Sequence, residues 1–292
     1  MSKRFTGGEV RLRAPAKINF ILEVIDRRPD GYHEIDSIFV PVDLCDEVTV
    51  NARDDSAEVR ICCDDPAVPI DQTNTAWRAV EAFANAYGPL PGIDIGIVKR
   101  IPAGAGLGGG SSDAAAVLRA LARLAGVADP APELFRMAAG VGADVPFFLR
   151  CVPARVRGIG EIVEPIPAPG FEWVAIAWPR VPVSTRSAYA ELDLSLTWPK
   201  TADRIPRFLS GTGRLEEAHN DFEAVVGRNV PQIPELKGKF LALGAITAGL
   251  SGSGSAVFGT YRDANSAARA AAILRGEGAW SAAAKRLQGV PE

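Results

Sequence analysis

The sequence predicts a two-domain protein of mixed α and β structure. Its 292 residues are long for one hydrophobic core, and 47% of them are hydrophobic, which is enough to fill two. Stretches of alternating apolar residues, typical of strands, are interspersed with stretches that have helical apolar spacing. Pro165, Pro167, Pro169 and Gly170 mark a linker. We therefore expect a first domain of residues 1–164 and a second of residues 165–292.

The order of elements follows from these patterns. In the first domain we expect strands at residues 10–24, 35–42, 47–50, 58–63 and 93–98, and helices at 75–86, 114–124 and 132–141. In the second we expect a strand at 173–178, helices beginning near 185 and at 219–223, a strand–loop–strand unit over 243–261, and a last helix at 264–274. No repeat of fixed period interrupts this order.

The composition excludes several classes of protein. No apolar run is long enough to span a membrane, and the charged N-terminus lacks the apolar segment of a signal peptide, so we expect a cytoplasmic protein. A net charge of −3 without a long basic run argues against nucleic acid as a partner. With 2 histidines and no C-x-x-C spacing among 4 cysteines, no dedicated metal cluster is expected.

The glycine-rich stretch over residues 99–126 carries the clearest chemical pattern. Its glycines allow a backbone to approach an anion closely. Ser111, Ser112 and Asp113 are good N-caps, and Gly126 can end the helix that follows. Because a helix N-terminus carries unpaired N–H groups and partial positive charge, this loop is expected to bind phosphate.

Three other interpretations compete for this stretch. Gly104, Gly106 and Gly109 form a literal G-x-G-x-x-G, but residues 99–102 separate it from the preceding strand, unlike a dinucleotide fingerprint. A Walker A loop would need a closing Gly-Lys-Ser/Thr, which is absent. A flexible linker would not lead into a capped amphipathic helix. A phosphate loop of another type remains.

The loop resembles the second motif of the GHMP kinase superfamily. That motif covers Pro102, Ala103, Gly104, Ala105, Gly106, Leu107, Gly108, Gly109, Gly110, Ser111 and Ser112. The run around Lys17 and Asn19 resembles the first motif, P-x-K-x-N. The third motif resembles residues 249–256, with Gly249, Ser251, Gly252, Ser253 and Gly254. The resemblance implies an α+β fold with an N-terminal nucleotide-binding α/β domain and a ferredoxin-like C-terminal domain.

The resemblance also implies roles for individual residues. ATP is the implied co-substrate, held by residues 102–112 together with Asn74 and Lys99, and Mg²⁺ would bridge its phosphates with the Ser112 hydroxyl as the one candidate protein ligand. Thr75 stands where the family commonly has leucine beside the adenine. Asp144, in Gly-Ala-Asp-Val-Pro-Phe, resembles the catalytic aspartate, and Lys17 would orient it. From the residues alone, Asn74 and Asp144 could instead be plain caps.

A second set of residues resembles the cytidyl-substrate members of the superfamily. These residues are Tyr32 and His33 in R-x-D-G-Y-H, the triple glycine, and the family-like strand over 157–161 that contains Gly160 and Glu161. The implied reaction phosphorylates the 2-hydroxyl of 4-diphosphocytidyl-2-C-methyl-D-erythritol in the non-mevalonate isoprenoid route. The implied substrate-binding residues are Asn19, Tyr32, His33, Thr185, Tyr189, Asn220 and Asp221. Tyr32 and Tyr189 would sandwich the cytosine, and His33 would read its base-pairing edge.

Other functions stay open at this point. Another GHMP-type small-molecule kinase, or a diphosphomevalonate decarboxylase, would share the phosphate loop without needing a cytosine pocket. A nucleotide-binding module without catalysis would keep the loop but would not need Lys17 or Asp144. An exposed hairpin end is the plainer interpretation of Tyr32 and His33.

Overall fold

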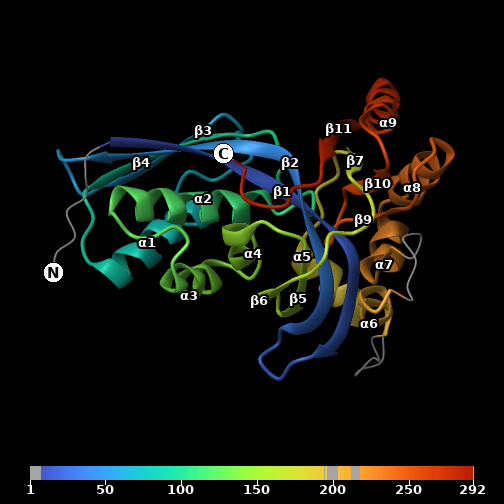
Figure 1. The fold of residues 1–292 in the computed structure, drawn as a ribbon, viewed down its shortest axis with the longest axis horizontal. Helices are drawn as coiled ribbons and strands as arrows, with labels where there is room; N and C mark the ends of the chain where they lie inside the picture. Colours follow the sequence, from blue (N-terminus) through green and yellow to red (C-terminus); the bar gives the residue numbers. More distant parts are fainter. Residues whose placement is uncertain (1–7, 194, 196–202, 212–217, 292) are drawn as a thin grey trace.

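Two long strands form the central ribbon of the molecule. The computed structural model describes residues 8–193, 195, 203–211 and 218–291. Strands β1 (Gly8–Arg27) and β2 (His33–Arg53) pair antiparallel and run the length of the first domain and then along the second, as the blue ribbon in Figure 1 shows. We predicted two strands over the residues of β2, but the structure has one. A register shift beside Pro15 absorbs the irregular residues 43–44, so the ladder with β1 stays continuous.

The first sheet is built around this ribbon. Its other strands are β3 (Val59–Cys63), β4 (Gly92–Val98), β5 (Ala154–Gly158), β6 (Ile162–Pro165) and β8 (His219–Asn220). The order is β3-β4-β2-β1-β8, with β5 on β2 and β6 on β5. Helices α1 (Thr75–Tyr87), α2 (Gly109–Leu124), α3 (Pro132–Val141) and α4 (Val145–Arg150) lie on one side of the sheet, below it in Figure 1. Helix α2 is buried along almost its whole length, so it is the centre of this core.

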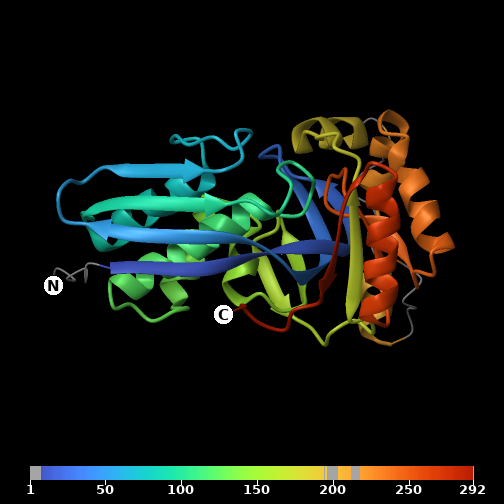
Figure 2. The ribbon, with the colours of Figure 1, turned by 90° about the horizontal axis from the view of Figure 1, so that it is seen from above.

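The second sheet has the order expected for a ferredoxin-like domain. Its strands are β7 (Trp173–Trp178), β9 (Ala248–Leu250), β10 (Val257–Tyr261) and β11 (Trp280–Lys285), arranged β11-β7-β10-β9 and all antiparallel. The helices that follow the linker are α5 (Thr185–Asp193), α6 (Arg204–Leu209), α7 (Phe222–Asn229), α8 (Gln232–Ala242) and α9 (Ala264–Gly276). Helices α8 and α9 lie at the end of the molecule farthest from β3 and β4 (Figure 2). The predicted α+β architecture is confirmed.

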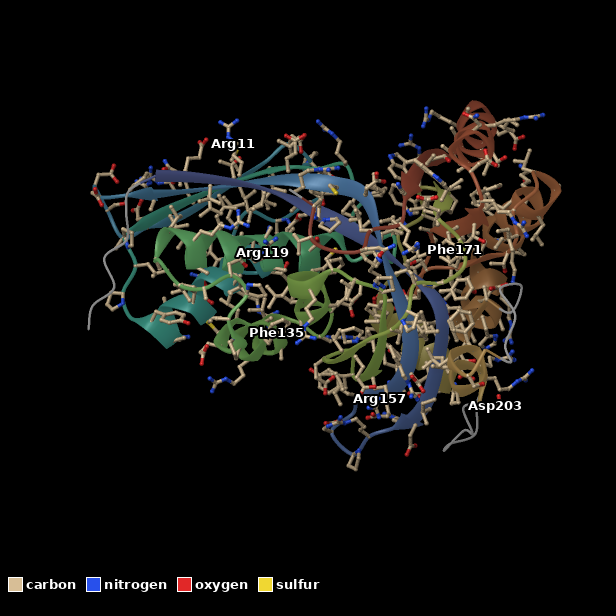
Figure 3. The ribbon with its side chains drawn as sticks, viewed as in Figure 1. Arg11, Arg119, Phe135, Arg157, Phe171 and Asp203 are labelled. Atoms are coloured by element: carbon tan, nitrogen blue, oxygen red, sulfur yellow. The ribbon has the colours of Figure 1, made fainter. Side chains whose placement is uncertain are left out.

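The two halves of the chain pack against each other and exchange a strand, so they are joined by more than the linker. β8 adds to the first sheet by pairing in parallel with β1 at Ile21 and Leu22. Phe171, labelled in Figure 3, packs against Phe20 of β1 with ring centroids 5.4 Å apart. The core that joins the halves therefore contains β1 side chains on one side and β7 side chains on the other.

Three local predictions were wrong. Helix α2 begins at Gly109, before the expected serine and aspartate caps, because Gly108 takes a left-handed N-cap conformation at φ +75°. The expected strand over 157–161 ends at Gly158, since positive φ at Gly158 and Gly160 turns the chain toward β6. Residues 219–220 form β8 before α7 begins at Phe222. The C-terminal stretch, for which we made no structural prediction, supplies β11.

Candidate active site

A cavity of about 1010 Å³ lies where the two halves meet. Its lining comes from the hairpin at residues 30–33, the phosphate loop (residues 102–112), Ala143 and Asp144, the first turns of α5, and Gly252 with Ser253. Sites for a single small ligand measure roughly 300 to 1,000 Å³. The cavity therefore lies at the upper end of the range for such sites.

The phosphate loop presents its backbone to this cavity. Each predicted ATP-binding residue from Pro102 to Ser111 lines the cavity, as do Asn74 and Lys99. Gly104, Gly106 and Gly108 adopt φ values of +68°, +81° and +75°, which residues with a Cβ rarely take. Helix α2 begins directly after them, so its unpaired N–H groups lie at the cavity wall, as an anion site requires.

Asn74 combines two roles in the structure. Its side-chain oxygen accepts a hydrogen bond from the Ala76 N–H at 2.8 Å and so caps α1, which was the plainer interpretation. Its amide nitrogen donates to the Pro69 carbonyl at 2.6 Å. Neighbouring Thr75 donates from Oγ1 to the Gly110 carbonyl at 2.8 Å. The start of α1 is thus tied to the phosphate loop.

Ser112 lies inside α2 rather than at the cavity surface. It is buried, and its Oγ has no hydrogen-bond partner among the residues that the structure describes. A buried hydroxyl without a partner is uncommon, and hydroxyl oxygen is a type of ligand that Mg²⁺ accepts. In the described part of the chain, no group of three His, Cys, Asp or Glu side chains could hold a metal ion. Ser112 therefore fits an ion bound mainly by phosphate oxygens.

Lys17 and Asp144 form an ion pair in the wall of the cavity. Lys17 Nζ lies 3.6 Å from Asp144 Oδ2 and 2.5 Å from Asn19 Oδ1. The Lys17 side chain is only 5% exposed, and this burial lowers its pKa while the Asp144 carboxylate opposes that shift. The register of β1 against β2 shifts on both sides of Lys17 and Asn19, once after Pro15 and once after Asn19. Two motifs far apart in sequence thus form one ion pair.

The surroundings of Asp144 keep its carboxylate available. Asp144 occupies the N-cap position of α4, but its side chain makes no capping hydrogen bond, which removes the plainer interpretation of this residue. Gly160 lies against it: a Cβ at Gly160 would come within 3.2 Å of Asp144 Oδ1. Glycine at position 160 therefore has a physical reason, since a side chain there would crowd Ala143 and the Asp144 carboxylate.

Lys99 belongs to a buried ion cluster behind the phosphate loop. Its Nζ lies 2.5 Å from Asp46 Oδ2 and 2.8 Å from Asp113 Oδ2. Asp46 Oδ1 also accepts the backbone N–H groups of Arg100 and Ile101, so it fixes the chain as it enters the loop. Sequence reasoning missed Asp46, because no local pattern shows that residues 46 and 99 are neighbours across β2 and β4.

The substrate end of the cavity is built from aromatic side chains. The His33 ring stacks on Tyr189 with centroids 4.4 Å apart at 15°, and Tyr189 meets Phe222 edge-on at 4.8 Å. Tyr32 lies at the hairpin tip and is 60% exposed. Tyr32, His33, Thr185 and Tyr189 all line the cavity, but His33 rather than Tyr32 contacts the Tyr189 face.

The third loop (residues 249–256) braces the phosphate loop. Ser251 Oγ donates to the Gly106 carbonyl at 2.9 Å, and the Ala256 N–H donates to the Ala105 carbonyl at 3.0 Å. A Cβ at Gly106 would lie 2.1 Å from the Ser251 carbonyl oxygen, so the two backbones touch. Gly252 and Ser253 line the cavity, whereas Gly249, Ser251 and Gly254 do not.

Asn220 and Asp221 lie outside the cavity lining. Asn220 Nδ2 donates to the carbonyls of Leu250 and Gly252, both at 2.8 Å, which holds the third loop. Asp221 Oδ2 accepts the Val24 N–H at 2.7 Å and so ties α7 to β1. The structure thus places these two predicted substrate-binding residues behind the cavity wall.

The fold and the cavity together define a two-domain GHMP-type kinase. Residues 74–151 match the family model of the GHMP kinases N-terminal domain, and residues 208–279 match that of the GHMP kinases C-terminal domain. A homoserine kinase from Cytophaga hutchinsonii shares the fold with a TM-score of 0.68 at 21% identity, covering 99% of this chain and 97% of that one.

Closer relatives narrow the class. The 4-diphosphocytidyl-2-C-methyl-D-erythritol kinase of Geobacter sulfurreducens is 41% identical over 95% of this chain and 99% of its own. That of Alkaliphilus metalliredigens is 42% identical over 87% and 89%. A crystal structure of 4-(cytidine 5'-diphospho)-2C-methyl-D-erythritol kinase superposes with a TM-score of 0.78 at 36% identity, covering 96% and 100%. This chain belongs to the 4-diphosphocytidyl-2-C-methyl-D-erythritol kinase family of the GHMP kinases.

Within the part of the chain that the structure describes, no helix combines the length and apolar character needed to cross a bilayer.

Proposed function

We propose that this chain transfers the γ-phosphoryl group of ATP to the 2-hydroxyl of 4-diphosphocytidyl-2-C-methyl-D-erythritol, a step of the non-mevalonate isoprenoid route. The observation that carries the proposal is the 3.6 Å ion pair of Lys17 and Asp144. This pair lies in the cavity between the phosphate loop and the substrate end, which is built from aromatic side chains. Its position supports a transfer between a nucleotide bound on one side and an alcohol bound on the other.

Asp144 would act on the substrate hydroxyl. A carboxylate held against a cation, without a capping bond of its own, can accept a proton from a hydroxyl placed beside it. Lys17, fixed by Asn19 and Asp144, would hold the carboxylate and the hydroxyl in line with the phosphoryl group. Phosphoryl transfer depends on such positioning and on charge stabilisation more than on covalent help.

The phosphate loop and the start of α2 would bind the ATP phosphates through backbone N–H groups. Mg²⁺, when bound, would neutralise charge on the phosphate oxygens, and Ser112 is the protein hydroxyl that could reach it. Lys99 would keep the loop in place from behind, because its ammonium group is already paired with Asp46 and Asp113.

A panel of acceptor alcohols tests this function. We expect ATP turnover with the cytidyl alcohol to exceed turnover with homoserine or mevalonate by a factor of at least about 100, since a site that binds a base rejects ligands lacking one. An equal or higher rate with a non-cytidyl alcohol would favour a sister kinase. Decarboxylation of diphosphomevalonate would identify the decarboxylase, and ATP binding without any turnover would leave only the binding module.

A further inference from the structure

Asp193, at the end of α5, has a place in the cavity that neither the family motifs nor the proposed mechanism assigns. Its Oδ1 lies 2.7 Å from His33 Nε2, and its Oδ2 lies 3.6 Å from Arg27 Nη1. Arg27 and His33 are partners in the β1–β2 register, the last pair before the tip hairpin (residues 28–32). One carboxylate from the second half of the chain therefore holds both legs of a hairpin from the first half.

Helix α5 presents two contacts to the same ring. Tyr189 and Asp193 are four residues apart and so lie on one helical face. Tyr189 stacks on the His33 ring, while Asp193 bonds to its edge. The His33 side chain is 6% exposed and that of Asp193 is 20% exposed, so this hydrogen bond is largely shielded from water. Shielding strengthens a hydrogen bond to a charged group.

The tip hairpin has contacts of its own, but they lie within it. The Arg28 N–H donates to the Tyr32 carbonyl at 2.7 Å, and the Tyr32 N–H donates to Asp30 Oδ1 at 3.1 Å. Arg28 also lies 3.0 Å from Asp30 and 3.5 Å from Glu34, but all three side chains are well exposed, and exposed ion pairs stabilise a conformation only slightly. The contact with α5 ties the hairpin to the second half of the chain and so bears on how Tyr32, at its tip, faces the cavity.

We propose that Asp193 is a positioning residue for recognition of the cytidyl base: its carboxylate holds the His33 ring against Tyr189 and so sets the shape of the base-binding end. The proposal rests on the proposed function for its substrate. Because a carboxylate oxygen accepts hydrogen bonds, His33 Nε2 carries the hydrogen in this arrangement. Asp193 acts through His33 and does not itself contact the reacting atoms.

Steady-state kinetics test this role. Asp193→Ala should raise the KM for the cytidyl substrate by about 10- to 150-fold, the effect of losing a hydrogen bond to a charged group, while the KM for ATP stays constant. Asp193→Asn keeps a carbonyl acceptor for Nε2–H, so its KM should rise by no more than about threefold. Glu191→Gln is the matched control, since Glu191 lies on the same helix but bonds to Asn229 at the surface.

A double-mutant cycle separates positioning from general damage. In a His33→Ala background, Asp193→Ala should change the KM for the cytidyl substrate by less than about twofold, because only its contact with the exposed Arg27 side chain remains. An unchanged KM in the single variant, an equal rise in the KM for ATP, or an undiminished effect in the His33→Ala background would each overturn the proposal.

A measurement on the wild-type protein needs neither substrate nor a variant at Asp193. The chain has 2 histidines, so the ¹⁵N ring signals of His33 can be assigned by comparison with His219→Gln. We expect His33 Nε2 to carry hydrogen at neutral pH. A bare Nε2 would refute the proposal even if cytidyl kinase activity were present, and failure of that activity would leave this result intact.

Discussion

The two ends of the cavity are built in different ways. At the phosphate end, the ligand-facing surface is backbone: glycines with positive φ, a helix N-terminus, and behind them a buried cluster of Lys99, Asp46 and Asp113. At the substrate end, the surface is made of side chains on a hairpin whose tip residue, Tyr32, is 60% exposed. One end is fixed by the core of the first domain, and the other by contacts between the halves.

This difference decides what a sequence can reveal. A backbone site needs glycines at fixed spacing, so it leaves a continuous pattern in the chain. A side-chain site needs partners that come from distant elements, and those partners leave no local pattern. The predictions below test each end of the cavity and the ion pair between them.

Removing the base at the centre should have the largest effect. Asp144→Asn keeps the shape of the side chain but cannot take up the substrate proton, so kcat should fall by about 10²- to 10⁴-fold. Affinity for ATP, measured by calorimetry, should change little because Asp144 does not touch the phosphate loop backbone. Asp54→Asn on the surface serves as the control, and wild-type turnover in Asp144→Asn would contradict the proposed mechanism.

Alanine substitutions at two glycines of the phosphate loop should distinguish the effect of a clash between the two loops from the effect of backbone strain. Gly104 and Gly106 have φ values of +68° and +81°, so alanine is strained at both. Only at Gly106 would the Cβ meet another backbone, 2.1 Å from the Ser251 carbonyl oxygen; at Gly104 the nearest atom is 3.6 Å away. Gly106→Ala should therefore lower the free energy of unfolding by about 1 to 3 kcal/mol more than Gly104→Ala.

Denaturant titration measures that difference, and calorimetry with ATP follows binding in parallel. We expect weaker ATP binding in Gly106→Ala than in Gly104→Ala, because the third loop and the phosphate loop would be forced apart. Equal losses of stability in the two variants would show that strain, and not contact between the loops, governs this end.

Truncating the aromatic rings probes the substrate end. Tyr32→Ala and Tyr189→Ala should each raise the KM for the cytidyl substrate by about 5- to 150-fold, the range for loss of one stacked ring, with the KM for ATP unaffected. The Tyr189 variant should show the larger rise, since it also removes the ring on which His33 stacks. If both values of KM for the cytidyl substrate stay at the wild-type level, the base binds elsewhere.

The buried ion cluster should produce a pH dependence of stability. Burial and the Asp46 carboxylate raise the pKa of Asp113 from 3.8 to about 7, against the opposing effect of Lys99. The folded chain then binds this proton more tightly than the unfolded chain does. The contribution of Asp113 to stability is therefore fully present below about pH 4 and is lost as the pH rises toward 7.

The expected slope is up to about 1.4 kcal/mol per pH unit for this one group. Asp113→Asn cannot titrate, so the difference between its free energy of unfolding and that of the wild type should vary with pH across this window. Urea titrations at several pH values measure it. Parallel curves for the two proteins would show that Asp113 stays ionised beside Lys99.

The sequence predicted much of the phosphate end and less of the rest. The loop from Pro102 to Ser111 lines the cavity as expected, and Lys17 meets Asp144 although their motifs are far apart in the chain. The start of α2 was misplaced because a left-handed glycine cap leaves no polar residue to mark it. The continuity of β2 was missed because a bulge interrupts its alternating pattern.

Residues at the substrate end were harder to place. The pocket positions of Tyr32, His33 and Tyr189 followed from the family resemblance, but Asp193 lies 160 residues from its partner His33 and carries no motif. The resemblance implied substrate binding by Asn220 and Asp221, yet Asn220 donates to carbonyls of the third loop and Asp221 accepts the Val24 N–H of β1. Only the tertiary structure distinguishes a residue that lines a cavity from one that supports its wall.

The pairing of β1 with β8 has a consequence for how this chain acquires its structure. β1 is paired by a strand at residues 219–220, about 200 residues further along the chain, and the Ala105 carbonyl of the phosphate loop accepts a hydrogen bond from the N–H of Ala256. Contacts so distant in sequence carry a large loop-closure entropy and form late. Chains truncated before Ala256 should therefore lack a finished phosphate loop, and pulse-labelled hydrogen exchange should find the β1–β8 amides among the last to gain protection.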